Sequence, residues 1–180
     1  MMSPAEMLAR LIAEPSDNNE HLAAYRDAVL DTNAKLAIDL GVRYGCITVA
    51  LLAGLAETGG ILESCDTEQC GLARARVRDI GLEPQWHFTV ADDLAWGQDV
   101  PDSIDVLSID TSHTYDQTLA ELRLFAPKMV MGGVMLLHDT VAFRSGVWQA
   151  IQTYRIVSRD WIVEERQNNN GLAILRRVKP

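Results

Sequence analysis

The chain has 180 residues, of which 48% are hydrophobic and 23% are charged, proportions typical of one globular domain. This composition excludes a disordered chain and a disulfide scaffold, and a net charge of −9 is not that of a general binder of nucleic acid or anionic membranes. Three cysteines without CxxC spacing indicate a reducing compartment. Because we find no signal peptide and no apolar stretch long enough for a bilayer, we expect a cytoplasmic protein.

Two helices are predicted before residue 36. The stretch Ser3-Pro4-Ala5-Glu6 resembles a capping box with a first-turn proline, and the apolar residues after it recur at helical spacing. The residues at 15–18, Pro-Ser-Asp-Asn, break this helix, and a second one follows over residues 22–30. We therefore expect a single domain, in which residues 1–35 form a helical segment and residues 36–180 form the core.

From residue 36 onward, short apolar runs lead to acidic residues and alternate with helical stretches. The runs cover residues 36–38, 61–62, 87–90, 104–109 and 134–137, and the acids are Asp39, Asp66, Asp92, Asp110 and Asp139. A parallel strand with its crossover helix needs about 30 residues, and buried parallel strands are continuous apolar runs. The pattern predicts five parallel strands in a Rossmann-like, doubly wound α/β sheet.

The C-terminal part is predicted to end this sheet with an antiparallel hairpin. Ser145 is a candidate cap for a helix through Ile156. Two apolar runs, at 161–164 and 172–175, then flank the Asn-Asn-Asn-Gly turn at 168–171, which is typical of a hairpin.

The carboxyl ends of the parallel strands are the expected binding edge, because ligands of open α/β sheets bind there. A single aspartate after a strand is as readily a turn former or helix cap, but five in the expected order favour a binding edge. The first strand leads into a loop with the spacing D-x-G-x-x-x-G, which differs from the dinucleotide fingerprint. The acid Asp39 disfavours a pyrophosphate there and suits a cationic ligand such as a sulfonium amino acid.

Several segments resemble one branch of the class I methyltransferases that use S-adenosylmethionine. Ala37–Gly45 resembles the first motif of the class. Ser108–Tyr115 resembles the IDGDHSY segment of the branch, while Leu136–Thr140 and Gly146–Trp148 resemble its HDT and GVW segments. That branch includes macrocin-type sugar O-methyltransferases and cephalosporin-hydroxylase-like proteins, and the resemblance extends from about residue 36 to the C-terminus.

The resemblance implies a set of cofactor-binding residues. The glycines would form the loop under the methionine part of the cofactor, and Asp66 would accept hydrogen bonds from the ribose hydroxyls. Either Asp92 or Asp93 would lie beside the adenine, and the sequence does not choose between them. The complete set is Asp39, Gly41, Gly45, Asp66, Asp92 and Asp93.

Two mechanisms are open for the reacting hydroxyl. Asp110 and Asp139 match positions where cation-dependent relatives hold Mg²⁺, which would lower the pKa of the hydroxyl. Those relatives have a third ligand beside the second aspartate, whereas this chain has His138 and Thr140 there, both poorer partners for Mg²⁺. Alternatively, His113 or His138 accepts the proton as a catalytic base, although each could simply hydrogen-bond a loop.

The function that we predict is O-methylation of a small-molecule hydroxyl, on a sugar or glycoside-like acceptor, with S-adenosylmethionine as donor. The alternative is a non-catalytic binding or assembly protein on the same scaffold, because the chain is short for this class. A nicotinamide-dependent reductase is disfavoured by the loop spacing and by Asp39. We expect no nucleic-acid or membrane partner. Short enzymes with helical N-termini commonly pair, so a homo-oligomer stays open.

Overall fold

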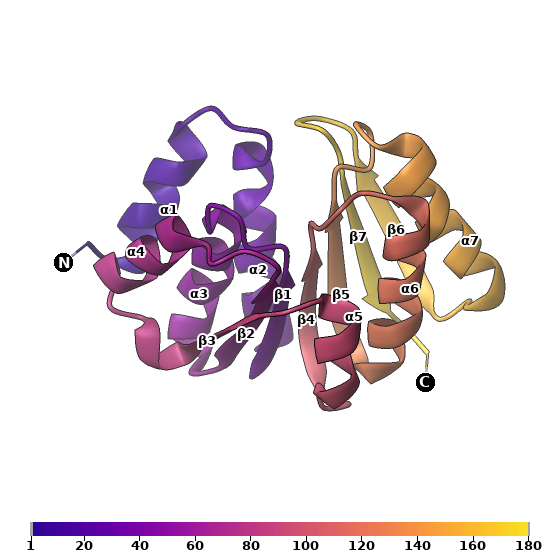
Figure 1. Cartoon of the computed structure of the whole chain (residues 1–180), viewed down its shortest axis with the longest axis horizontal. Helices are drawn as coiled ribbons and strands as arrows, with labels where there is room; N and C mark the ends of the chain where they lie inside the picture. Colours follow the sequence, from indigo (N-terminus) through magenta and orange to yellow (C-terminus); the bar gives the residue numbers. More distant parts are fainter. Residues whose placement is uncertain (1, 180) are drawn as a thin grey trace.

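The computed structural model describes residues 2–179 and places one seven-stranded sheet between two layers of helices (Figure 1). The strands are β1 (Leu36–Leu40), β2 (Ile61–Asp66), β3 (Trp86–Val90), β4 (Ile104–Ile109), β5 (Met129–His138), β6 (Trp161–Arg166) and β7 (Leu172–Arg177). The α-helices are α1 (Pro4–Ala13), α2 (Leu22–Thr32), α3 (Cys46–Thr58), α4 (Gly71–Asp79), α5 (Asp93–Trp96), α6 (Tyr115–Phe125) and α7 (Gln149–Val157).

The strand order is β3-β2-β1-β4-β5-β7-β6. Strands β1 to β5 pair in parallel, and β7 pairs antiparallel with both β5 and β6. The predicted doubly wound sheet with a terminal hairpin is therefore confirmed. The chain moves from β1 outward to β3 and then returns to β4 on the other side of β1, so the switch point of the sheet lies between β1 and β4.

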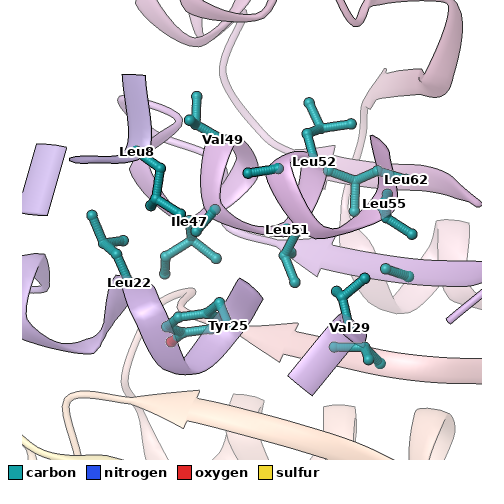
Figure 2. Close-up of a cluster of buried hydrophobic side chains, with 14 of the residues drawn as sticks. Leu8, Leu22, Tyr25, Val29, Ile47, Val49, Leu51, Leu52, Leu55 and Leu62 are labelled. Atoms are coloured by element: carbon teal, nitrogen blue, oxygen red, sulfur yellow. The ribbon is translucent and has the colours of Figure 1, made fainter. Parts of the chain in front are cut away.

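Helices α1 to α4 cover one face of the sheet, on the left of Figure 1, and α5 to α7 cover the other. Helix α3 is buried along most of its length, from Ile47 to Leu55, because it packs between the sheet and α1 and α2. Tyr25 and Val29 of α2 point toward the buried side chains of α3 (Figure 2). This packing explains why α3 is apolar all round rather than on one stripe.

The N-terminal prediction agrees with the structure. Ser3 and Glu6 form the reciprocal capping box of α1, and α2 starts at Leu22 after the break at residues 15–18. Both helices pack against α3, so they belong to the same core as the sheet. Within residues 2–179, none of the helices has both the length and the apolar character that a membrane span requires.

Two local predictions differ from the structure. Strand β1 extends through Asp39 and Leu40, so Asp39 lies inside the strand rather than after it. Ser145 does not cap a helix: it lies within a π-helical turn, Arg144–Trp148, that leads directly into α7. An N-cap residue needs an extended backbone before the first turn, whereas the amides of Gly146 and Val147 already bond to Phe143 O.

Candidate active site

A cavity of about 430 Å³ lies at the carboxyl ends of the central strands, next to the switch point of the sheet. This volume is in the range of small-molecule binding sites. Twelve residues line it: Gly41, Arg43, Cys65, Asp66, Thr67, Ala91, Asp92, Asp93, Asp110, Thr111, Ser112 and Gln117. Four of them are aspartates and one is an arginine, so the wall of the cavity is acidic.

The glycine loop after β1 forms the floor of this cavity. Gly41 has a φ of +86°, and a Cβ on it would lie 2.0 Å from the carbonyl oxygen of Asp110. Only glycine combines that backbone conformation with such a close approach. Gly45 has a different position, since it begins α3 and faces Ala73 of α4, and it does not line the cavity. Of the two predicted glycines, the structure brings only Gly41 to the cavity wall.

Asp66 ends β2 with its carboxylate held by two backbone amides. The amide of Arg43 donates to Oδ2 and the amide of Glu68 donates to Oδ1, each at 2.9 Å. A carboxylate oxygen has room for a second hydrogen bond. Asp66 is therefore oriented and can still accept hydrogen bonds from a ligand in the cavity.

Asp39 lies beneath the cavity rather than on its wall. It is completely buried, and Thr48 of α3 donates a hydrogen bond of 2.7 Å to its Oδ2. Burial raises the pKa of Asp39 to about 7, because water is excluded from the carboxyl group. Asp39 therefore connects β1 to α3 through Thr48 and does not line either cavity.

Asp92 and Asp93 both line the cavity but make different contacts. Asp92 is the N-cap of α5, where its Oδ1 accepts from the amide of Ala95 at 2.9 Å. Asp93 is buried, and its Oδ1 accepts from the side-chain amide of Gln117 at 2.7 Å. The sequence did not separate these neighbours, and the structure gives one of them a clear capping role.

The ends of β4 and β5 bring two carboxylates and an imidazole together. Nε2 of His113 lies 2.9 Å from Oδ1 of Asp110 and 3.1 Å from Oδ2 of Asp139. Ligand atoms of these three residues lie within 4.8 Å of one another, close enough to hold one metal ion. The resemblance placed a third metal ligand beside Asp139 in the sequence. In the structure the third candidate ligand is instead His113, from the loop after β4.

His138 lies behind this cluster with its side chain almost completely buried. Its Nδ1 is 3.3 Å from Asp139 and 3.7 Å from Asp110. Burial alone would lower the pKa of His138, but the hydrogen bonds and charges of the two aspartates outweigh burial and raise it to about 10. His138 is therefore a cation at neutral pH and balances the charge of the two aspartates.

The same contacts act on the other members of the cluster. Burial would raise the pKa of Asp110, but the hydrogen bond from His113 and the nearby imidazole of His138 lower it to about 2. Burial would likewise lower the pKa of His113, but Asp110 and Asp139 raise it above its usual value. His113 is half-buried, so unlike His138 it remains accessible to a small molecule.

Two residues of this cluster have a strained backbone. His113 and Asp139 adopt left-handed conformations, with φ values of +57° and +63°, which cost a non-glycine residue about 1–3 kcal/mol. The ring of Phe143 stacks on His113 at 4.6 Å, and a Cβ on Gly146 would lie 2.0 Å from the His113 carbonyl oxygen. The loop after β5 thus holds His113 in a conformation that it would not adopt alone.

A second cavity, of about 300 Å³, lies between the glycine loop and the N-terminal segment. Ser16, Asp17 and Asn18 form one wall, and Arg43 bridges the two segments through a 2.9 Å ion pair with Asp17. Asp110 borders both cavities. The residues before 36 therefore contribute to the site, although we predicted no functional residue among them.

Several other residues of the site were not predicted from the sequence to be functional. Gln117 and Thr111 line the main cavity, and Glu121 lies buried behind them. His21 of the N-terminal segment contacts His138 edge-on at 5.4 Å. Helical spacing alone puts Gln117 and Glu121 on one side of α6, but only the packing of α6 against α5 places them next to the cavity.

Comparison with known families gives one match, to a family described as a methyltransferase domain, over residues 38–140. These residues include the glycine loop and the six aspartates at the carboxyl ends of the strands, Asp39, Asp66, Asp92, Asp93, Asp110 and Asp139. The comparison with curated proteins finds no match.

Solved structures share the fold at low sequence identity. A methyltransferase of Podospora anserina, PaMTH1, solved with SAH bound, has a TM-score of 0.75 and 11% identity, over 98% of this chain and 88% of that chain. An O-methyltransferase of Bacillus cereus in complex with SAH has a TM-score of 0.76 and 14% identity, over 98% and 91%. A methyltransferase of Geobacter sulfurreducens has a TM-score of 0.71 and 16% identity, over 89% and 79%.

Proposed function

Since the chain belongs to the methyltransferase domain family, we propose that it transfers a methyl group from S-adenosylmethionine to a hydroxyl of a small molecule, of the sugar or glycoside type. The observation that carries this proposal is the acidic cavity at the switch point, with the Asp110–His113–Asp139 cluster at its edge. An acidic cavity fits a donor that bears a positive sulfonium and hydroxyl groups. Solved structures with this fold were determined with SAH bound.

The residues that would hold the donor follow from their contacts. Gly41 leaves the loop backbone open to the ligand, and the oriented carboxylate of Asp66 would accept hydrogen bonds from both ribose hydroxyls. Asp92 and Asp93 would border the nucleobase. When bound, the donor supplies an already activated methyl group, so the protein has to position the acceptor and handle its proton.

Asp110 and Asp139 are the residues that would hold a divalent cation. Two carboxylates suit Mg²⁺ or Mn²⁺, and an imidazole is a ligand for several transition metals. A bound cation would supply positive charge beside the acceptor oxygen. The nitrogen of His113 that faces the carboxylates cannot bind a cation and accept a proton at the same time.

We assign the catalytic base to His113 rather than to His138. His113 is half-buried next to Asp110, which lines both cavities, and its contacts with two carboxylates stabilise the protonated form that accepting a proton would create. His138 is buried and already protonated at neutral pH, so it can hold the aspartates in place but cannot accept the proton of the acceptor. The sequence already favoured His113, which lies just past a motif acid, and the difference in burial between the two histidines supports that choice.

The acceptor class rests on the resemblance of Ser108–Tyr115 and Leu136–Thr140 to the branch with macrocin-type O-methyltransferases. We assign the chain to that branch. The chain contributes a flat, exposed aromatic surface, the ring of Phe143, next to His113. Such a surface suits the apolar face of a sugar ring or another planar acceptor.

Titration calorimetry with S-adenosylhomocysteine and a methyl-transfer assay against monosaccharides, glycosides and phenolic diols test the proposal. We expect saturable binding, and methylation of at least one hydroxyl detected by mass spectrometry. Asp110→Ala should bind the cofactor product but lose turnover, while Asp102→Ala, an exposed aspartate outside the site, should behave as wild type. Absence of binding by the wild-type protein would favour the alternative of a non-catalytic assembly protein.

Removing divalent cations with EDTA distinguishes a reaction in which Asp110 and Asp139 hold a cation from one that uses only His113. If a cation takes part, turnover should fall with EDTA and return with Mg²⁺ or Mn²⁺, whereas a reaction that uses only His113 should be insensitive to EDTA. The variant His113→Gln should lose turnover in either case.

A further inference from the structure

The turn that closes the C-terminal hairpin is longer than chain reversal requires. A hairpin can close with two residues, whereas the loop between β6 and β7 spans residues 167–171. Asn169, Asn170 and Gly171 adopt consecutive left-handed conformations, with φ values of +46°, +68° and +92°, which asparagine and glycine tolerate better than other residues. We call residues 168–171 the asparagine turn. Its extra length allows its side chains and carbonyl groups to contact two other segments.

One side of the asparagine turn holds the N-terminal segment. The side chain of Asn169 donates through Nδ2 to the carbonyl oxygen of Ser16 at 2.9 Å and accepts through Oδ1 from the amide of Glu20 at 3.3 Å. Asn168 adds a hydrogen bond of 2.5 Å from its Nδ2 to Oε2 of Glu20. Because Ser16 itself lines the second cavity, these contacts hold the wall that the N-terminal segment gives to that cavity.

The other side of the asparagine turn holds the loop after β5. The carbonyl oxygen of Asn170 accepts from the amides of Val141 and Ala142, at 2.8 and 3.0 Å. These two residues lie between Asp139 and Phe143, which contact the proposed catalytic base through a carboxylate oxygen at 3.1 Å and a stacked ring at 4.6 Å. The asparagine turn therefore connects the wall of the second cavity to the loop that holds the base.

We propose that Asn169 is a positioning residue for methyl transfer, because it holds the N-terminal segment so that the acceptor is bound in the second cavity with its hydroxyl next to the catalytic cluster. This inference rests on the proposed function. Asp110 borders both cavities, so a compound in the second cavity would lie close to the cluster and to a donor in the main cavity. The asparagine turn does not line the main cavity, and we therefore expect Asn169 to affect the acceptor and not the donor.

Steady-state kinetics of the full chain carrying Asn169→Gly test this inference. Glycine keeps the left-handed backbone but removes the contacts to Ser16 and Glu20. With saturating S-adenosylmethionine, and methyl glucoside or catechol as the probe acceptor, we expect the KM for the acceptor to rise at least about tenfold, the value of one hydrogen bond of ordinary strength. The Kd for S-adenosylhomocysteine, measured by calorimetry, should stay within about threefold of the wild-type value.

Asn33→Gly is the matched control for this substitution. Asn33 is also an exposed asparagine with a left-handed backbone, at a φ of +49°, but it lies at the end of α2 and lines neither cavity. This variant makes the same chemical change at the same backbone conformation, so it should keep the wild-type KM and Kd.

The outcomes separate positioning from a general effect on folding. A wild-type acceptor KM in Asn169→Gly, or an equal rise of the acceptor KM and the Kd for S-adenosylhomocysteine, overturns the inference while the proposed function stands. If Asn169→Gly does not fold, Asn169→Asp decides in its place. It keeps the oxygen that accepts from Glu20 but loses the donor to Ser16, and it should also raise the acceptor KM without changing the Kd. Failure of the wild-type protein to methylate any glycoside or diol overturns both.

Discussion

Replacing Asp110 with asparagine should lower the free energy of unfolding at pH 7 by about 2–4 kcal/mol. Asp110 lies near both His113, at 2.9 Å, and His138, at 3.7 Å, and Asp139 is the second carboxylate that both histidines approach. Asparagine has nearly the same shape but no charge, so the change removes the electrostatic contribution and leaves the packing largely intact.

The magnitude follows from the pKa of Asp110. The histidines lower it from 3.8 to about 2, and this shift of just under two pKa units corresponds to about 2.5 kcal/mol. Loss of one partner also leaves the buried His138 cation with Asp139 alone, and breaking a buried pair costs about 3–5 kcal/mol. Weaker repulsion between Asp110 and Asp139 opposes these losses, which is why we expect a total near the lower values.

Urea unfolding of both proteins, followed by circular dichroism in the presence of EDTA, measures this difference. Because the pKa of Asp110 is lowered in the folded state, its stabilisation is complete above pH 3.8 and is lost as the pH falls through 2. The difference between the proteins should fall to about half near pH 3. Equal stability at pH 7, or a difference that stays constant on acidification, would refute the reasoning. Asp102→Asn, at an exposed aspartate, is the control.

Three further changes probe other contacts. Gly41→Ala forces a Cβ to within 2.0 Å of Asp110 O at a φ of +86°, so we expect a lower melting temperature and at least about tenfold weaker binding of S-adenosylhomocysteine in calorimetry. Gly146→Ala would displace His113 through a similar 2.0 Å contact, and should reduce kcat by at least about tenfold while leaving cofactor affinity within about threefold. Glu121→Gln should flatten the pH dependence of stability. Because the pKa of Glu121 is raised by burial from 4.5 to about 8, the wild-type protein loses stability as the pH rises between these values. Melting temperatures measured from pH 5 to 9 should therefore fall more steeply for the wild-type protein than for the variant. Parallel curves for the two proteins would contradict a raised pKa of Glu121.

Local sequence signals determined the architecture. The apolar runs of β1 to β5 and the Asn-Gly turn of the hairpin are contiguous in the chain, so their periodicity and turn chemistry could be recognised without tertiary information. The same holds for the capping box at Ser3, which involves residues three positions apart. Because parallel strands end at one edge of a sheet, the order of the aspartates also predicted where a ligand would bind.

Only the tertiary structure decided what each side chain at that edge does. Asp39 and Asp66 look equivalent in the sequence, yet one lies inside β1 bonded to Thr48 and the other faces the cavity. His113 and His138 likewise differ in burial, because His138 ends β5 against His21 of the N-terminal segment, whereas His113 lies in the loop between β4 and α6.

The contact between Asp93 and Gln117 and the contact between Asp139 and His113 join segments that are far apart in the sequence. Asp93 and Gln117 belong to different helices, and Asp139 and His113 lie in the loops after different strands. Their distances depend on how α5 packs on α6 and on how the loop after β5 folds back onto His113. The sequence by itself therefore determined the scaffold and the edge where a ligand would bind, while the pairing, burial and charge of the side chains there depended on long-range packing, which no local pattern encodes.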